Sequence, residues 1–570
     1  MDDEPASKPS TSTSPSSTLL LRPRREPFEH GLLPIPKLIF SDGTLTLASL
    51  KDKLLRRPSP SPHRIDAGSL ADALQISPEH AGLVLDTLAA VLPSDPEDDT
   101  ADVRDLVLFL YLQSYKRLLP KAHKDSSSVA DVWPSTSAFD AHLSVLSPLQ
   151  LVRSNSRRFM PSQADEEVHQ LSYLQKHMGN ILALLSESIE GGEEDETLVL
   201  TAQNFQHLEF LIQVGEKGCE GISLNQAAPF FANSYPDMPA APVSVVQVHE
   251  WILQTIAASL EHATERAALK ENGSVSPSDP DVPMADAMNH VRSQGSSTQS
   301  GNYVQSNAVY FRNQIFVEGF SKTSVIKQAR DIKSDSVKVL NCHDSVIYIL
   351  APLRYATVYG CSDATIILGA VGKAVRVEHC ERVQVISAAK HISIANCREC
   401  IFYLGVNQRP LILGDNHKLQ VAPYNTFYSE LEEHMAQVGI DATINRWNEP
   451  LVLGMVDPHD PLSHPAGVSD AQAESASCLD PDQFTNFLIP NWPGVQSVQM
   501  TQHNPFSLPE VYQASQRKNS SILHDIQRDL RDVQLEENKK RELLSALHMH
   551  FKDWLYASGR IRQLYFLQGD

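Results

Sequence analysis

Four stretches of sequence decide the fold: VKVLNCHDSVIYIL (337–350), ATVYGCSDATIIL (356–368), VRVEHCERVQVI (375–386) and ISIANCRECIFYL (392–404). Each stretch holds an apolar burst, a polar turn that contains a cysteine, and a second apolar burst. Their cysteines are spaced 19, 19 and 17 residues apart, and Asp415 continues the series 18 residues further on. A period of about 18 residues with two or three short strands per repeat is typical of a parallel β-helix, in which stacked coils bury one another's apolar faces.

The repeat also explains the cysteines. Because each cysteine occupies the same place in its coil, we expect the four to form an inward ladder of small apolar side chains. Similar bursts of three to six residues occur from Val309 to Val421, with no helix-length pattern between them. The ladder residues are Cys342, Cys361, Cys380 and Cys397.

The rest of the chain divides by composition. Segments rich in Ser, Pro and Asp have too little apolar surface to fold. Elsewhere, apolar residues at helical spacing predict helices at 103–119, 167–185, 198–214 and 243–263. We predict an α+β multidomain chain. Its parts are a disordered tail (1–26), a helical domain (27–265), a disordered linker (266–304), the β-helix (305–435), an irregular Pro-rich segment (436–515) and C-terminal helices (516–570), whose apolar face includes Ile522, Ile526, Leu530 and Val533.

Charge and hydropathy exclude several function classes. The 570 residues include 48 Lys and Arg but 69 Asp and Glu, a formal net charge of −21, so we expect no nucleic-acid partner. No apolar run approaches 18 residues, and we expect no membrane insertion. The acidic start and an odd count of 7 cysteines favour a reducing compartment over secretion, and we expect the protein in the cytoplasm.

Familiar catalytic and metal motifs are absent or incomplete. Gly369–Ala374 lacks the spacing and the Ser or Thr of a phosphate loop. Cys397 and Cys400 have zinc-ligand spacing but no second pair in that form, and the repeat period already accounts for Cys397. His548 and His550 point to different faces of a helix. We therefore expect no catalytic residues, no metal and no cofactor.

Residues 337–447 resemble the tubulin-binding cofactor C (C-CAP) domain family. The resemblance rests on Ile394–Arg398, on the run Leu419–Tyr424, and on Tyr428–Leu431 followed by Ile444–Asn448. It implies a right-handed β-helix. The residues that match family structural positions are Cys342, Cys361, Cys380, Cys397, Pro423, Tyr424 and Trp447.

The family's enzymes use an arginine finger on a Gln-Gln-apolar-Arg-apolar strand. Aligned on Asn396–Arg398, this sequence has Lys390 and His391 in place of the glutamines and Ser393 in place of the arginine. A serine hydroxyl is short and neutral and lacks the planar donor fork that bridges phosphate oxygens. We interpret Lys390, His391 and Ser393 as a degenerate finger strand and a candidate partner surface, with Lys390 and Arg398 as possible substitute cations.

The resemblance implies a non-catalytic cytoskeletal adaptor that positions the centrosome, spindle pole or another microtubule-organising centre and the Golgi, and so affects cell shape. Tubulin, an Arf-like small GTPase or a centrosomal protein is the implied partner. Two alternatives stay open. One is a GTPase-activating protein for tubulin or an Arf-like GTPase, which would act through a displaced cation, and the other is a tubulin-folding cofactor that acts by binding alone.

Overall fold

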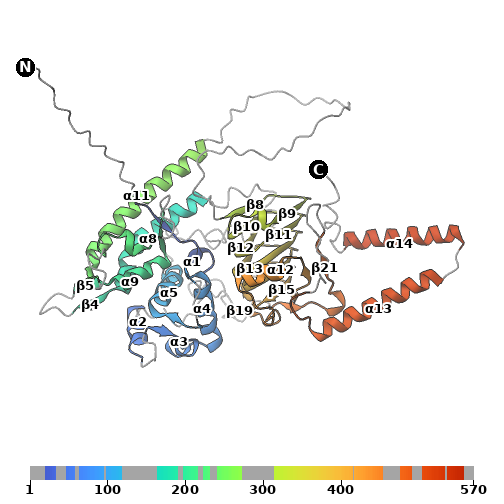
Figure 1. The fold of residues 1–570 in the computed structure, drawn as a ribbon, viewed down its shortest axis with the longest axis horizontal. Helices are drawn as coiled ribbons and strands as arrows, with labels where there is room; N and C mark the ends of the chain where they lie inside the picture. Colours follow the sequence, from blue (N-terminus) through green and yellow to red (C-terminus); the bar gives the residue numbers. More distant parts are fainter. Residues whose placement is uncertain are drawn as a thin grey trace, which may run out of the picture.

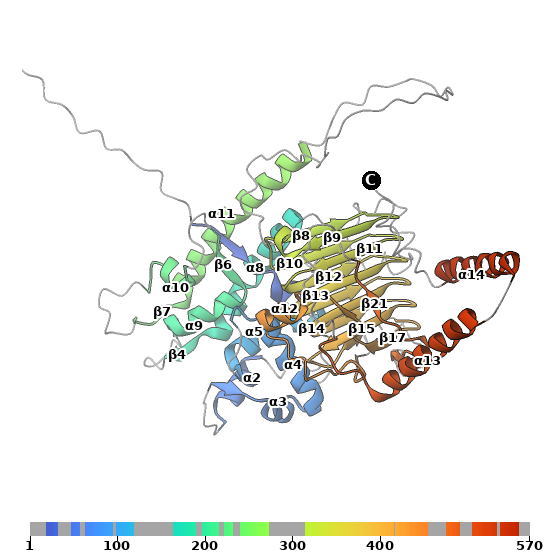
Figure 2. The same cartoon turned by 45° about the vertical axis from the view of Figure 1, so that its right-hand side comes forward.

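A computed structural model gives the fold (Figures 1 and 2). It describes residues 19–31, 33, 47–57, 63–94, 98–118, 163–189, 197–215, 222–231, 240–272, 314–414, 416–453, 475–490, 504–532 and 536–557. Two cores are present, one in the mainly helical N-terminal half and one in the C-terminal half. Within the described residues, no helix combines the length and the hydropathy needed to cross a membrane.

The C-terminal half contains the parallel β-helix that the cysteine period predicts. Sheet I consists of β8, β10, β12, the ends of β13 and β14, β16 and β19, and sheet II of β9, β11, the starts of β13 and β14, β15, β17 and β20. The bounds are β8 Ile315–Glu318, β9 Ser324–Gln328, β10 Ser336–Leu340, β11 Val346–Leu350, β12 Leu353–Tyr359, β13 Thr365–Glu378, β14 Gln384–Ala395, β15 Ile401–Val406, β16 Leu411–Leu413, β17 Gln420–Pro423, β18 Thr426–Phe427, β19 Leu451–Leu453, β20 Ser477–Cys478 and β21 Phe487–Leu488, with helix α12 at Leu431–Val438.

The coils turn at the cysteines. The residue directly before each one has a positive φ, from 51° at Asn341 to 64° at Gly360, a conformation that Gly and Asn adopt most readily. All four cysteines are fully buried, and each thiol donates to the carbonyl two residues before it: Cys342, Cys361, Cys380 and Cys397. Asp415, which continues the series in the sequence, lies outside the described residues.

The N-terminal half is a helical domain with small two- and three-stranded sheets at its edges. The long helices α8 and α11 pack against each other. The helices are α1 Glu26–Glu29, α2 Leu47–Leu55, α3 Ala67–Leu74, α4 Pro78–Val91, α5 Val103–Leu118, α8 Gln163–Leu185, α9 Ala202–Gln206, α10 Leu224–Ala227 and α11 Val245–Asn272, and the strands are β1 Leu21–Pro23, β2 Arg64–Ile65, β3 Ala101–Asp102, β4 Glu187–Ile189, β5 Thr197–Leu200, β6 Ile212–Val214 and β7 Val243–Ser244.

Several sequence-based boundaries differ from the structure. The segment 436–515, predicted as irregular, contains β19 and β20, which pair with β16 and β17, and its last residues begin a helix at Glu510 and not at 516. The segment 198–214, predicted as one helix, is divided among β5, α9, a 3₁₀ turn and β6, because its ends pair with β7 and β1. Residues 19–26, assigned to a disordered tail, contain buried Leu21 and the paired strand β1. Helix α11 continues to Asn272, into the predicted linker. Residues 1–18 and 273–304 lie outside the described residues, as does Val533.

Two further helices, α13 (Glu510–Asp532) and α14 (Glu537–Ala557), follow the β-helix. They extend away from it as an arm, drawn in red in Figures 1 and 2. The fold is thus a helical domain and a β-helix side by side, with the arm on the far side of the β-helix.

Candidate functional site

Ser393 lies in the outward row of sheet I, where strand alternation places it between the inward residues Ile392 and Ile394. Its partner on the preceding coil is Arg376 and its partner on the next is Leu411. The same row continues backwards through Thr357 to Lys338. Ser393 itself is half-buried, and the side chains on either side of it explain why.

The helical domain covers this face of sheet I. Leu411 and Leu453 are buried in the core of the helical domain and not in that of the β-helix. Beside them, the Tyr355 hydroxyl donates a 2.7 Å hydrogen bond to the Ala90 carbonyl at the end of α4. The Lys373 ammonium donates to the neighbouring Ala89 carbonyl at 3.2 Å. The outward row that contains Ser393 therefore forms part of an interface between the two halves of the chain.

A short segment at the start of the helical domain, which includes α1, completes this interface, and we call residues 24–30 the clasp. Arg24 donates to the Val91 carbonyl at 3.0 Å, which ties the clasp to α4. Glu29 pairs with Lys338 at 3.2 Å, and its carbonyl accepts a hydrogen bond from Arg376. The clasp thus bonds to the helical domain and to the outward row of sheet I at once.

The clasp interface has a distinctive electrostatic character. Burial alone would raise the pKa of Glu29, but the positive charges of Lys338 and Arg25 lower it to about 2. His30 stacks on Tyr355 with ring centroids 4.5 Å apart. Burial lowers the pKa of His30 to about 3, although Glu29 opposes the shift. At neutral pH the interface holds an ionised carboxylate beside an uncharged imidazole.

His391, the second residue of the degenerate finger strand, is buried. It pairs with Ala374 on the preceding coil, and burial lowers its pKa to about 4. It is therefore neutral at pH 7 and unable to stabilise phosphate charge as a cation.

Lys390 and Arg398 occupy other parts of the coil. Lys390 is half-buried at a bulge between the two sheets. Its ammonium lies 3.2 Å from where a Cβ would stand on Gly439, the left-handed residue that ends α12. The side chain of Arg398 is exposed at a corner of the coil. Its backbone forms isolated parallel β-bridges with Glu381 and His417 of the adjacent coils. The structure thus does not bring these two cations together with Ser393 in one row.

The remaining family-motif residues close the end of the β-helix. Pro423 ends β17, and the fully buried Tyr424 packs on Phe506 with ring centroids 5.5 Å apart. Trp447 packs on Tyr512 at 5.7 Å. The thiol of Cys400 donates to the Cys380 and Arg398 carbonyls, so both members of the Cys397–Cys400 pair bond to backbone carbonyl groups.

Sequence reasoning missed Arg376 and the clasp. Arg376 had a usable signal, because it occupies the place in its coil that Ser393 occupies in the next. Glu29 and His30 had none, since their partners lie about 300 or more residues away in the sequence.

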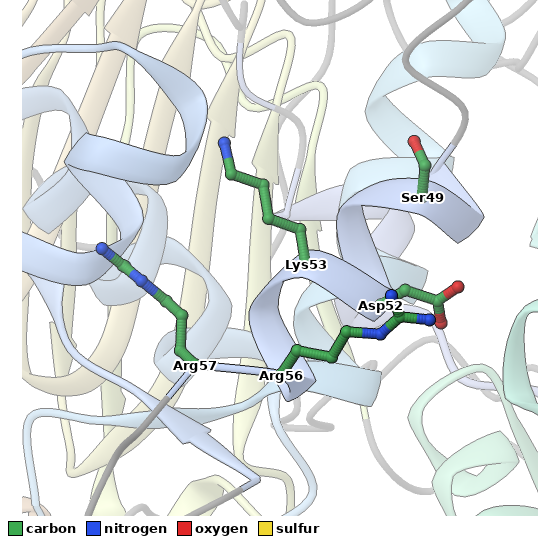
Figure 3. Close-up of a pocket in the computed structure, with 5 residues that line it drawn as sticks. All are labelled: Ser49, Asp52, Lys53, Arg56 and Arg57. Carbon is green, nitrogen blue, oxygen red and sulfur yellow. The ribbon is translucent and has the colours of Figure 1, made fainter.

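One surface hollow lies on the helical domain. It is lined by charged side chains of α2 and the residues after it, and Figure 3 shows Lys53, Arg56 and Arg57 diverging from the backbone there. Arg57 is already bound to the Ser69 carbonyl and to Asp72. None of the predicted site residues lines this hollow, whose lining is Ser49, Asp52, Lys53, Arg56 and Arg57.

Comparison with known proteins agrees with this fold. Residues 334–451 match the protein-family model described as Tubulin binding cofactor C. The similar proteins include three that carry the name TBCC domain-containing protein 1. They come from Rattus norvegicus (27% identical over 42% of this chain and 39% of the relative), Bos taurus and Homo sapiens (each 28% identical over 43% and 41%).

These matches have a defined extent. Each aligned region spans about two fifths of the relative's length. The chain therefore carries a tubulin binding cofactor C domain on a parallel β-helix, and it is similar over that extent to the TBCC domain-containing proteins.

Proposed function

We propose that this chain is a non-catalytic cytoskeletal adaptor built around its tubulin binding cofactor C domain. The observation that carries the proposal is the environment of Ser393. At the position where the family resemblance implies an arginine finger, the chain has a short neutral side chain in a row that the helical domain and the clasp cover.

The physical requirement for a finger supports this view. A finger must enter a partner's nucleotide site and present a planar, charged donor to the transferring phosphoryl group, which accelerates hydrolysis by about 10³ to 10⁵. Ser393 offers neither charge nor reach. A partner's active site would also have to displace Glu29 from Lys338 and Leu411 from the helical core before it could approach the strand.

The proposed partner is tubulin or an Arf-like GTPase, engaged by an exposed part of the β-helix. The proposed site of action is the centrosome, the spindle pole or an equivalent microtubule-organising centre, with effects on Golgi position and cell shape. Imaging of the tagged chain beside microtubule-organising-centre and Golgi markers tests this part. A uniform distribution together with unchanged Golgi position after depletion would contradict it.

One observation favours a second candidate, a GTPase-activating protein that uses Arg376. Arg376 stands beside Ser393 on the outward row, one coil away, and it has the donor fork that serine lacks. In the structure its guanidinium binds Glu378 and the Glu29 carbonyl. Activity would require the clasp to release it.

Single-turnover GTP hydrolysis decides between the two candidates. The assay uses tubulin with its folding cofactors and, separately, an Arf-like GTPase. Each is mixed with the wild-type chain, with Arg376→Ala or with Arg354→Ala. Arg354→Ala is the matched control, since Arg354 is an exposed arginine of the neighbouring strand β12. The adaptor proposal expects no stimulation by any of the three. Stimulation by the wild type that is lost in Arg376→Ala and kept in Arg354→Ala would overturn it.

Binding without turnover separates the adaptor from a folding cofactor. If the wild-type chain binds tubulin and also raises the yield of refolded tubulin, the binding-only cofactor is the better description. Binding with an unchanged refolding yield supports the adaptor.

A further inference from the structure

Among the described residues, the arm formed by α13 and α14 bonds to the β-helix at its base. The Tyr512 hydroxyl donates to the Leu479 carbonyl at 2.6 Å, and the Ser515 hydroxyl donates to Asp482 at 2.7 Å. The ring of Tyr512 also packs on Phe484. Beyond this base α13 runs away from the β-helix, and α14 runs back toward it from the far end of α13, with the two helices apart along most of their length (Figures 1 and 2).

Each helix of the arm carries an apolar stripe. At 100° per residue, Ile522, Leu523 and Ile526 fall within about 100° of arc on α13. Five apolar residues of α14, Trp554 among them, fall within an arc of the same width. The other four are Leu543, Leu544, Leu547 and Phe551.

These stripes face solvent. Leu523 is 60% exposed, Leu544 58% and Phe551 54%. On the opposite side of α14, Met549 is exposed to the same degree, 61%, and the other large exposed apolar residue described on that side, Tyr556, lies two turns away. Single exposed apolar residues are common on protein surfaces, whereas aligned ones over two successive helices mark an interaction surface.

The charge of the arm indicates what the stripes bind. Residues 510–557 contain eight basic and eight acidic side chains, so the arm is neutral in a chain of net charge −21. A surface for anionic lipid or nucleic acid needs an excess of basic residues, which this arm lacks. A mixture of both signs beside an apolar stripe is typical of helices that pair with other helices of the same kind.

We propose that the arm is a self-association surface, through which two copies of this chain pair by their stripes in a two-fold helical bundle. The dimensions fit. Helices of 23 and 21 residues present roughly 65 Å of length and, at about 10 Å width, on the order of 650 Å² per copy. A standard interface takes about 800 Å² from each partner.

Pairing through the arm has a consequence for the rest of the molecule. Each arm emerges from the end of a β-helix, so a dimer holds two cofactor C domains in one particle. A partner with repeated binding sites, such as a polymer, would then be bound at both domains with an increased effective concentration. This inference does not depend on the proposed function.

Sedimentation velocity of the full chain at micromolar concentrations tests the proposal. The molar mass obtained for the wild type should be twice the 63.1 kDa mass of one chain. Leu544→Glu on α14, and separately Leu523→Glu on α13, should raise the dimer dissociation constant by at least about tenfold. The matched control is Met549→Glu, which places the same charge at equal exposure on the opposite face and should change the constant by no more than about twofold.

Salt and lipid provide independent readouts. Added salt should strengthen the dimer, because it screens repulsion between two bodies of charge −21 while leaving apolar burial intact. A monomeric wild type would overturn the proposal, as would equal weakening by Met549→Glu and Leu544→Glu. A monomer that binds phosphatidylcholine–phosphatidylserine vesicles through Leu544 would overturn it in favour of a membrane surface.

Discussion

Lowering the pH from 7 to 5 should destabilise the protein through His391. Burial lowers the pKa of this histidine from 6.5 to about 4, and its side chain is 5% exposed. Below pH 6.5 the unfolded chain therefore takes up a proton that the folded chain takes up only near pH 4. Its contribution to stability is complete above about pH 6.5 and is lost as the pH falls toward 4.

The size of the effect follows from linkage. At 1.36 kcal/mol per pKa unit, the contribution of His391 to the free energy of unfolding falls by about 2 kcal/mol at pH 5 and by about 3 kcal/mol below pH 4. His30, whose pKa is about 3, loses a similar amount between pH 7 and 5, so the wild type loses the sum of the two. The Glu29 carboxylate acts in the same direction but at lower pH, because its pKa is about 2 against an ordinary 4.5. The window between pH 7 and 5 therefore reports on histidines.

Urea unfolding measured by circular dichroism at pH 7 and pH 5 tests this prediction. His391→Gln keeps a buried polar side chain but removes the titration, so it should lose about 2 kcal/mol less than the wild type over this interval. His550→Gln, at an exposed position of α14, should behave as the wild type does. If the wild type and His391→Gln lose equal stability between the two pH values, the reasoning from burial is wrong.

Substitutions at three further positions have defined outcomes in the same unfolding assay. Tyr355→Phe removes the hydrogen bond to the Ala90 carbonyl and should cost about 1 kcal/mol; an unchanged midpoint would contradict this contact. Cys361→Leu adds volume to the fully buried ladder and should cost about 1 to 3 kcal/mol, whereas Cys361→Ala should be milder. Tyr424→Phe removes a buried hydroxyl that has no hydrogen-bond partner among the described residues, so it should be neutral or raise stability by up to about 1 kcal/mol, and a large loss would reveal an unseen partner.

The β-helix could be predicted from sequence because its information is local and repeated. Each coil repeats the same inward pattern, such as Val375 and Val377 and then Ile392 and Ile394, so the period alone gives both the fold and the burial of the cysteines. The helices at 103–118 and 245–272 were also predicted within a few residues, apart from the C-terminal end of the second.

The surroundings of Ser393 could not be predicted in the same way. The family resemblance identified the strand that contains Ser393. The residues that cover this face of sheet I come from the clasp and α4, which contact the sheet through pairs such as Glu29–Lys338 and Ala90–Tyr355. No periodicity relates these partners. The error at 198–214 has a similar cause, since pairing of Val199 with Ser244 overrides a local helical pattern.

The clasp has a consequence for how the protein is made. Glu29 leaves the ribosome 347 residues before Arg376, a delay of roughly 17 to 70 s at ordinary rates of synthesis. During that time Leu411 is also missing from the helical core, so the apolar surface of the N-terminal half stays uncovered. Glu29, among the first residues of this interface to be synthesised, thus waits through most of the synthesis of the chain for its partners, and the nascent N-terminal half is a natural client for chaperones.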